Sequence, residues 1–205
     1  MTSDAPDDAL DRLRREGQRA LAELFTQYYD RLERMVRFRM DRRLSSRVDV
    51  ADVLQEAYLD AAKRIGAYLA KPEAPFFVWL RGIAANTLAD VHRRHLGAEL
   101  RDAARDQSLY QRGPEGSSEL LAAQLAGHFT SPSQAAMRDE VAARIEAALE
   151  EMDEIDREVL ALRHFEQLSN NEVAEVLGLS KTAASNRYVR ALARLKEILL
   201  RAEIP

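Results

Sequence analysis

Residues 168–188 read LSNNEVAEVLGLSKTAASNRY, a stretch that contains start and stop signals for two short helices. Ser169 and Glu172 have the spacing of a capping box, in which each side chain bonds the backbone N–H of the other residue at a helix start. Gly178 can end that helix, because glycine adopts the left-handed conformation without steric cost. Ser180 can then cap a second helix. This order predicts a helix-turn-helix, whose second helix enters the DNA major groove.

The predicted second helix has one apolar and one basic face. Small Ala174 suits a close approach of two helices, and the residues expected to fill their shared core are Val173, Leu177, Leu179 and Ala184. At helical spacing, the inward positions of the second helix are Ala184, Tyr188, Ala191, Leu192, Leu195 and Leu199. The outward positions, able to bond phosphates and base edges, are Thr182, Asn186, Arg187, Arg190 and Arg194. The alternative is an ordinary helical hairpin with a solvated basic face, but the order of the signals favours DNA binding.

A second informative stretch is DVADVLQEAY, residues 49–58. Helical spacing places an apolar stripe on one side, and on the other it aligns Asp52, Gln55, Glu56 and Asp60. Acids four residues apart on a helix repel each other by a few tenths of a kcal/mol. Asp49 is a plausible N-cap. The acidic side is therefore either a solvated surface or the docking site of a basic partner.

A third long helix is predicted from the apolar spacing over residues 77–91, after a loop that contains Pro72 and Pro75. On one face of it, away from the apolar stripe, lie Trp79, Gly82, Asn86 and Arg93. An aromatic ring, an amide and a guanidinium suit unpaired bases, and Phe76 in the adjoining loop adds a ring. Alternatively, Trp79 and Phe76 extend the core.

The tail of this helix, residues 92–95, reads HRRH and is basic enough to bind phosphate. His92 and His95 have a spacing that allows a metal pair, but the sequence supplies no third ligand, so no metal site is predicted.

Composition limits the class of protein. The chain has 205 residues, 46% of them hydrophobic, with eight glycines, six prolines and no cysteine, which favours a helical protein without disulfides. The net charge of −4 is segregated, because residues 30–47 and 181–201 are basic. No apolar run suits a signal peptide or a membrane span, so a cytoplasmic location is expected. No catalytic constellation is present, and we expect neither enzymatic activity nor a cofactor.

Together these patterns predict an all-α protein with two small helical domains joined by a flexible linker. The expected domains are residues 1–105 and 137–205, and the second contains the helix-turn-helix. Residues 106–136 are rich in Gly, Pro and Ser and predict the linker, in which 120–125 could form a short helical turn. We expect the helix that starts near Asp49 to stop before residue 67, where the AYLAKPEAP segment begins.

Three pieces of the chain, in this order, resemble one known family. They are DVADVLQEAYLDAAKRI, PFFVWLRGIAANTLADVHRR, and the helix-turn-helix with the preceding LEEMDEIDREVLALRHFEQLS. The chain resembles the extracytoplasmic-function sigma factors of bacterial RNA polymerase, from about residue 21 to 100 and again from about 141 to 200. The resemblance implies a transcription initiation factor that directs core polymerase to promoters and aids promoter melting.

The resemblance also implies a role for each face. The residues expected to bind basic helices of core polymerase are Asp49, Asp52, Gln55 and Glu56. Those expected at the melted minus-ten element are the loop 66–75 with Phe76, Trp79, Asn86 and Arg93. The duplex minus-thirty-five element would be read by Thr182, Ser185, Asn186, Arg187 and Arg190, although many relatives carry a basic residue where this chain has Ser185. Core polymerase and promoter DNA are the expected partners, with an anti-sigma factor as a further expected partner.

Two other classes of protein are compatible with the same residues. A stand-alone helix-turn-helix regulator would bind duplex DNA without polymerase, usually as a dimer on two half-sites. A helical interaction module would not contact DNA at all. Specific DNA binding that requires core polymerase separates the initiation factor from both.

Overall fold

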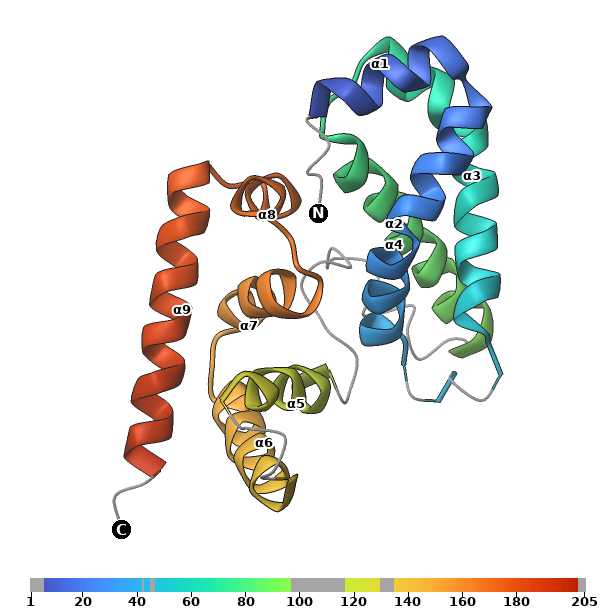
Figure 1. Ribbon diagram of the computed structural model, residues 1–205. Coiled ribbons are helices and arrows are strands. Elements are labelled where there is room, and N and C mark those ends of the chain that lie inside the picture. The colour runs from blue at the N-terminus through green and yellow to red at the C-terminus, as the bar shows by residue number, and fades with distance from the viewer. Residues whose placement is uncertain (1–5, 42, 45–46, 97–116, 130–134, 203–205) are drawn as a thin grey trace. The chain divides into compact units, whose positions relative to one another are not determined.

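The computed structural model of the chain describes residues 6–41, 43–44, 47–96, 117–129 and 135–202, and every regular element in these ranges is a helix (Figure 1). The expected all-α fold is confirmed. The helices divide between two compact units. Of the described residues, 6–37 and 43–96 belong to the first unit, and 38–41 and 117–202 belong to the second.

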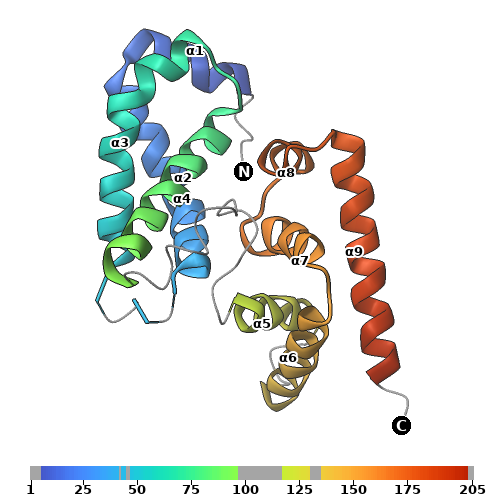
Figure 2. The same cartoon turned by 180° about the vertical axis from the view of Figure 1, so that it is seen from behind.

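The first unit contains α1 (Pro6–Glu16), most of α2 (Gln18–Arg39), α3 (Val50–Ala70) and α4 (Phe76–Leu96). In both views α2, α3 and α4 lie side by side, and α1 lies across one end of them (Figures 1 and 2). Each helix turns its apolar stripe inward, as the three- and four-residue spacing predicts. The side chains buried at the centre include Leu21, Leu24, Leu32, Leu54, Ala57, Leu80, Ala84 and Leu88.

Helix α3 begins as predicted but ends later. The Asp49 side chain accepts a hydrogen bond from the Ala51 N–H at 2.9 Å, which is the N-cap expected from the sequence. The helix was expected to stop before residue 67, yet it continues to Ala70. Burial of Tyr68 stabilises this last turn, and its hydroxyl donates to the Ala74 carbonyl at 2.8 Å. Half of the predicted 66–75 loop is therefore helix.

The second unit contains α5 (Ser117–Phe129), α6 (Ala135–Glu150), α7 (Glu154–Leu160), the π-helical turn η2 (Ala161–Phe165), α8 (Asn170–Leu177) and α9 (Lys181–Ala202). Helix α9 packs against α6, α7 and α8 (Figure 2). Its inward face buries Ala184, Ala191, Leu195 and Ile198.

Helix α5 lies within the 106–136 segment that the sequence favoured as a linker. It packs against α6 and η2, and its buried residues are Leu121, Ala122, Leu125 and Ala126. Four apolar residues at helical spacing thus join the core of the second unit, whereas only a short turn was expected here. Composition predicted a linker because the neighbouring residues are rich in Gly, Pro and Ser.

The second unit also holds a buried charge cluster around Arg39. Its Nη2 lies 2.6 Å from an oxygen of Glu158 and 2.6 Å from an oxygen of Glu166, and its Nε donates to Glu166 at 2.8 Å. All three side chains are less than a tenth exposed. Burial alone would lower the pKa of Arg39, but the negative charges of Glu166 and Glu158 outweigh burial and raise it.

Within the described residues, no helix has the length and apolar content that a bilayer crossing requires.

Candidate functional site

The helix-turn-helix has the local geometry that its sequence predicts. Glu172 N–H donates to the Ser169 hydroxyl at 3.3 Å, and Ser169 N–H donates to the Glu172 carboxylate at 2.7 Å, which completes the capping box. Gly178 has a φ of 63°, the left-handed conformation that ends α8. Ser180 caps α9 by accepting from the Ala183 N–H at 3.1 Å. The Asn170 amide also donates to the carbonyl of the first α9 residue, which ties the two helices together.

The core of this motif is smaller than predicted. Val173, Ala174 and Ala184 are buried, whereas Leu177 and Leu179 are only half-buried. These two leucines flank the turn at Gly178, at the edge of the motif.

The first three turns of α9 present an open face. Thr182, Ser185, Asn186 and Arg190 are exposed on it, and within the described residues their side chains have no hydrogen-bond or ion-pair partner. At the centre of the same face lies Val189, with 61% of its surface exposed. Hydroxyl, amide and guanidinium groups suit base edges and phosphates, and an exposed methyl group suits the methyl of thymine.

Arg187 has a different environment from the other predicted DNA-binding residues. Its Nη1 lies 3.1 Å from an oxygen of Asp156 on α7, and Asp156 is nearly buried. Tyr188, the next residue of α9, faces inward, and its hydroxyl lies 3.1 Å from Nε2 of His164 in η2. These contacts hold α9 against α7 and η2, so Arg187 helps to position the exposed face.

In the first unit, Asp52, Gln55 and Glu56 are exposed on one side of α3, and we name this surface the acidic face. Leu59, one turn further along the same side, is also exposed, with 52% of its surface accessible. Asp52 and Gln55 form no side-chain hydrogen bond or ion pair within the described residues. The acidic face therefore exposes polar groups and one aliphatic side chain together.

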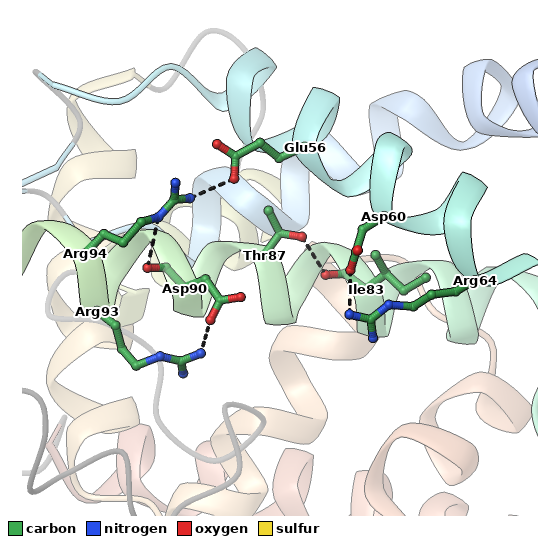
Figure 3. A network of polar contacts seen from close by, with 8 residues as sticks. All are labelled: Glu56, Asp60, Arg64, Ile83, Thr87, Asp90, Arg93 and Arg94. Atoms are coloured by element: carbon green, nitrogen blue, oxygen red, sulfur yellow. Dashed lines mark hydrogen bonds and ion pairs between the residues drawn. The ribbon is translucent and has the colours of Figure 1, made fainter.

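Among the described residues, Glu56 is the one member of the acidic face that has a side-chain partner, Arg94 on α4. The Arg94 Nη2 lies 2.7 Å from the Glu56 carboxylate, and its Nε donates to the Asp90 carbonyl at 3.4 Å. The Asp90 carboxylate pairs in turn with Arg93 (Figure 3). These four side chains line an open groove of about 480 Å³ between α3 and α4.

The aromatic side chains predicted for unpaired bases lie together at the start of α4. The Trp79 ring stacks on Tyr68 with centroids 4.5 Å apart, and the Phe76 ring is 5.6 Å from Trp79. Trp79 is half-buried, whereas only 2% of Phe76 is exposed. Burial raises the pKa of Tyr68 to about 12, so its hydroxyl remains protonated and keeps its hydrogen bond to Ala74.

Asn86 and Arg93 are exposed on the side of α4 that Trp79 occupies. Phe76 fits the alternative that the aromatic residues only extend the core, because it is almost fully buried. Trp79 does not fit it, because part of the Trp79 surface is accessible. Asp90, which lies on the same stripe, was not singled out from the sequence. In the part of the chain that the structure describes, no three His, Asp or Glu side chains are placed to hold a metal ion.

Sequence reasoning also missed Val189, Leu59 and the pairing of Arg94. Val189 and Leu59 each interrupt a polar stripe, and that interruption was the available signal. The pairing of Arg94 with Glu56 joins residues 38 positions apart on two helices, so no local spacing could predict it.

Comparison with known proteins finds matches in both units. The family model described as sigma-70 region 2 matches residues 24–96, and the model described as sigma-70, region 4 matches residues 142–195. The first range contains the acidic face and the rings of Tyr68, Phe76 and Trp79. The second range contains the helix-turn-helix.

Whole proteins give the same result. RNA polymerase sigma factor CnrH of Cupriavidus metallidurans is 31% identical over 152 residues, which cover 74% of this chain and 73% of that protein. RNA polymerase sigma-H factor of Pseudomonas aeruginosa is 27% identical over 93% of this chain and 92% of its own length. ECF RNA polymerase sigma factor SigD of Mycobacterium tuberculosis is 30% identical over 74% of this chain and 63% of its own length.

A solved structure of CnrH in complex with the cytosolic domain of CnrY is also similar to this chain. It has a TM-score of 0.53 and 25% sequence identity, and the match covers 98% of this chain and 99% of that one.

Proposed function

Because this chain belongs to the extracytoplasmic-function sigma factors of the sigma-70 family, which direct RNA polymerase to promoters, we propose that it reads both a minus-ten and a minus-thirty-five element. The observation that carries the proposal is the pairing, in one chain, of an acidic face on α3 with a helix-turn-helix whose α9 face is open. In this proposal the chain acts in the cytoplasm and contributes recognition and melting, while the polymerase performs the chemistry.

The acidic face is the proposed binding site for basic helices of core polymerase. Asp52, Gln55 and Glu56 supply the polar contacts, and Leu59, one turn further along α3, supplies an apolar contact beside them. Asp49 contributes indirectly, because its side chain is used to cap α3.

The start and outer side of α4 form the proposed site for the unpaired minus-ten strand. Trp79 offers an accessible ring held by Tyr68, and Asn86 and Arg93 follow it along the helix. Phe76 packs beside Trp79 and supports it, since its own surface is almost fully covered. A base that has left the duplex would stack on Trp79 and bond to Asn86.

Replacing Trp79 by Ala is expected to reduce promoter melting about tenfold, because stacking of one base is worth about 1–3 kcal/mol. Reactivity of unpaired thymines toward permanganate in the polymerase complex measures the melted fraction. Trp79→Phe keeps a ring on Tyr68 and should retain most of the melting. Full melting with Trp79→Ala would exclude Trp79 from the base-binding site.

The α9 face is the proposed reader of the duplex minus-thirty-five element. Thr182, Ser185, Asn186 and Arg190 reach bases and phosphates from an exposed surface, while Arg187 acts mainly by holding α9 against Asp156. Val189 lies among them and is proposed to contact a thymine methyl group in the major groove.

Replacing the thymines of the minus-thirty-five element one at a time by deoxyuridine removes single methyl groups. With the native chain, one such replacement should weaken promoter binding about three- to fivefold, because burying one methyl group is worth about 0.8 kcal/mol. With Val189→Ala the same replacement should have no effect. Leu200→Ala, which truncates another exposed aliphatic residue of α9, is the matched control and should retain the sensitivity. An unchanged uridine effect in Val189→Ala would rule out this contact.

An anti-sigma factor is a proposed further partner. The support is the similarity to the solved structure of CnrH, which is bound there to the cytosolic domain of CnrY.

Run-off transcription with purified protein, sigma-free core polymerase and fragmented genomic DNA of the source organism tests the proposed function. Discrete RNA start sites that share two spaced upstream elements are the expected result. Binding to duplex DNA without polymerase, together with the absence of protein-dependent starts, would instead indicate a stand-alone helix-turn-helix regulator.

A further inference from the structure

The groove between α3 and α4 brings together residues that the proposed function assigns to two different partners. Glu56 belongs to the acidic face proposed for core polymerase, and Arg93 belongs to the side of α4 proposed for DNA. Arg94, a member of the basic segment 92–95, connects them, because its guanidinium contacts both Glu56 and the Asp90 carbonyl (Figure 3).

Both arginines of the groove are neutralised by acids of the same unit. Arg94 pairs with Glu56 and Arg93 pairs with Asp90, so two positive charges face two negative charges. The groove also lies at the C-terminal turn of α4, where the helix dipole places partial negative charge. In this arrangement a DNA phosphate meets no net positive charge.

The pairs are also open to exchange. The side chains of Arg94 and Glu56 are about half exposed, at 54% and 50%, so water and a second cation can reach them. Ion pairs of this exposure are weak, and close charge pairs within an interface couple more strongly, so an arginine of a docked partner can displace Arg94 from Glu56. Once Glu56 pairs elsewhere, Arg94 retains its contact with the Asp90 carbonyl within the described residues.

We propose that the groove of Glu56, Asp90, Arg93 and Arg94 is a binding site for a DNA backbone phosphate that stays neutralised until polymerase engages Glu56. Arg94 is the phosphate-binding residue, and Glu56 is its counter-ion in the free chain. Docking on polymerase thereby raises the affinity of the same unit for promoter DNA. The inference rests on the proposed function for the identity of the partner that takes Glu56, but the groove itself can be tested without polymerase.

The first experiment uses the free full-length chain and a labelled 30-base-pair duplex without promoter sequence, over a range of salt concentrations. Glu56→Ala should bind this duplex about two- to fivefold more tightly than the native chain, which is the range of exposed ion pairs. The slope of log K against log salt should become steeper by about 0.9, as one added phosphate contact requires. Glu56→Ala combined with Arg94→Ala should return both values to those of the native chain.

Asp60→Ala is the matched control. Asp60 pairs with Arg64 at 2.8 Å on the same helix, so its removal changes the net charge equally and also frees an arginine, but outside the groove (Figure 3). The proposal requires a clearly smaller effect from this variant. An equal effect of Asp60→Ala, or a Glu56→Ala effect that persists without Arg94, would overturn it.

The second experiment uses the polymerase complex on a promoter fragment. Arg94→Ala should weaken promoter binding about two- to fivefold and reduce the salt slope by about 0.9. Its affinity for core polymerase should not fall, and should rise by up to the same factor, because polymerase no longer has to break the Glu56–Arg94 pair. Unchanged promoter binding and slope would show that the groove does not hold a phosphate in the complex. A native chain that fails to bind core polymerase would instead contradict the proposed function and leave the free-chain result to decide the groove.

Discussion

Reversing the charge of both Asp52 and Glu56 to Arg is expected to abolish binding to core polymerase, with a loss of at least ~100-fold. The acidic face would then present two cations to basic helices, and breaking desolvated charge pairs at an interface costs about 2–5 kcal/mol before repulsion is added. Both side chains are exposed on one side of α3 and are not part of the core, so the fold should be retained. Biolayer interferometry with immobilised core polymerase measures the affinity directly.

A variant with the same change in net charge separates this effect from general electrostatics. Glu23→Arg with Glu33→Arg places the reversal on α2, where the two acids pair with Arg12 and Arg37 rather than lying on the acidic face. This control should bind core polymerase with nearly native affinity. Equal losses in both variants, or retained binding in the Asp52 and Glu56 variant, would move the polymerase interface away from α3.

The charge pattern of the acidic face also favours a role in binding a basic partner. Its acids repel one another slightly, so a helix selected for stability alone would not align them. Two of the three members, Asp52 and Gln55, have no side-chain partner within the described ranges, while the third is held by Arg94. A basic partner would offset this repulsion and pair with the Asp52 carboxylate.

Three capping signals that act within one turn of helix could be predicted from the sequence. The Asp49 cap, the Ser169 and Glu172 capping box, and the left-handed Gly178 all depend on residues no more than three positions apart, and the structure shows each of them. The helix-turn-helix and the exposed side of α9 followed from these caps together with the apolar spacing. The family resemblance added partners and roles, which spacing alone does not contain.

Contacts between distant residues could not be predicted in the same way. Arg39 meets Glu158 and Glu166 across 119 and 127 residues, and Arg94 meets Glu56 across 38. A sequence of one chain gives no measure of which charges will meet after folding. The groove that carries the proposed phosphate site is lined by one such pair, Arg94 and Glu56.

Two helix boundaries differ from the prediction because of packing. Gly66 and the prolines that follow it predicted an early end of α3, but Tyr68, which stacks on Trp79 and donates a hydrogen bond, extends the helix to Ala70. Low local hydrophobicity around α5 predicted a linker, but its four buried apolar residues find a surface on α6 and η2. In both cases tertiary contacts outweighed the local signal.

Replacing Arg39 by Met is expected to lower the unfolding free energy of the second unit by about 3–5 kcal/mol. The substitution keeps most of the side-chain volume but removes the arginine that pairs with both Glu158 and Glu166, and breaking a buried ion pair by removing one partner costs about this much. Urea unfolding followed by far-UV circular dichroism measures the loss. Trp79, the one tryptophan of the sequence, lies in the first unit, and its fluorescence reports on that unit separately.

Two further variants show whether the cost comes from breaking the buried ion pairs of Arg39. Arg37→Met, two residues earlier on α2, removes an exposed arginine that pairs with Glu33, and it should change stability by less than about 1 kcal/mol. Arg39→Met combined with Glu158→Leu and Glu166→Leu removes the whole cluster and should recover most of the lost stability, because apolar groups of similar volume can replace a buried ion pair. If the triple variant is as unstable as Arg39→Met alone, the cost arises from lost packing rather than from buried charge. Glu166 is three residues before Ser169, the residue that caps α8 in the helix-turn-helix. If the triple variant recovers its stability, it should therefore also recover binding to the minus-thirty-five element.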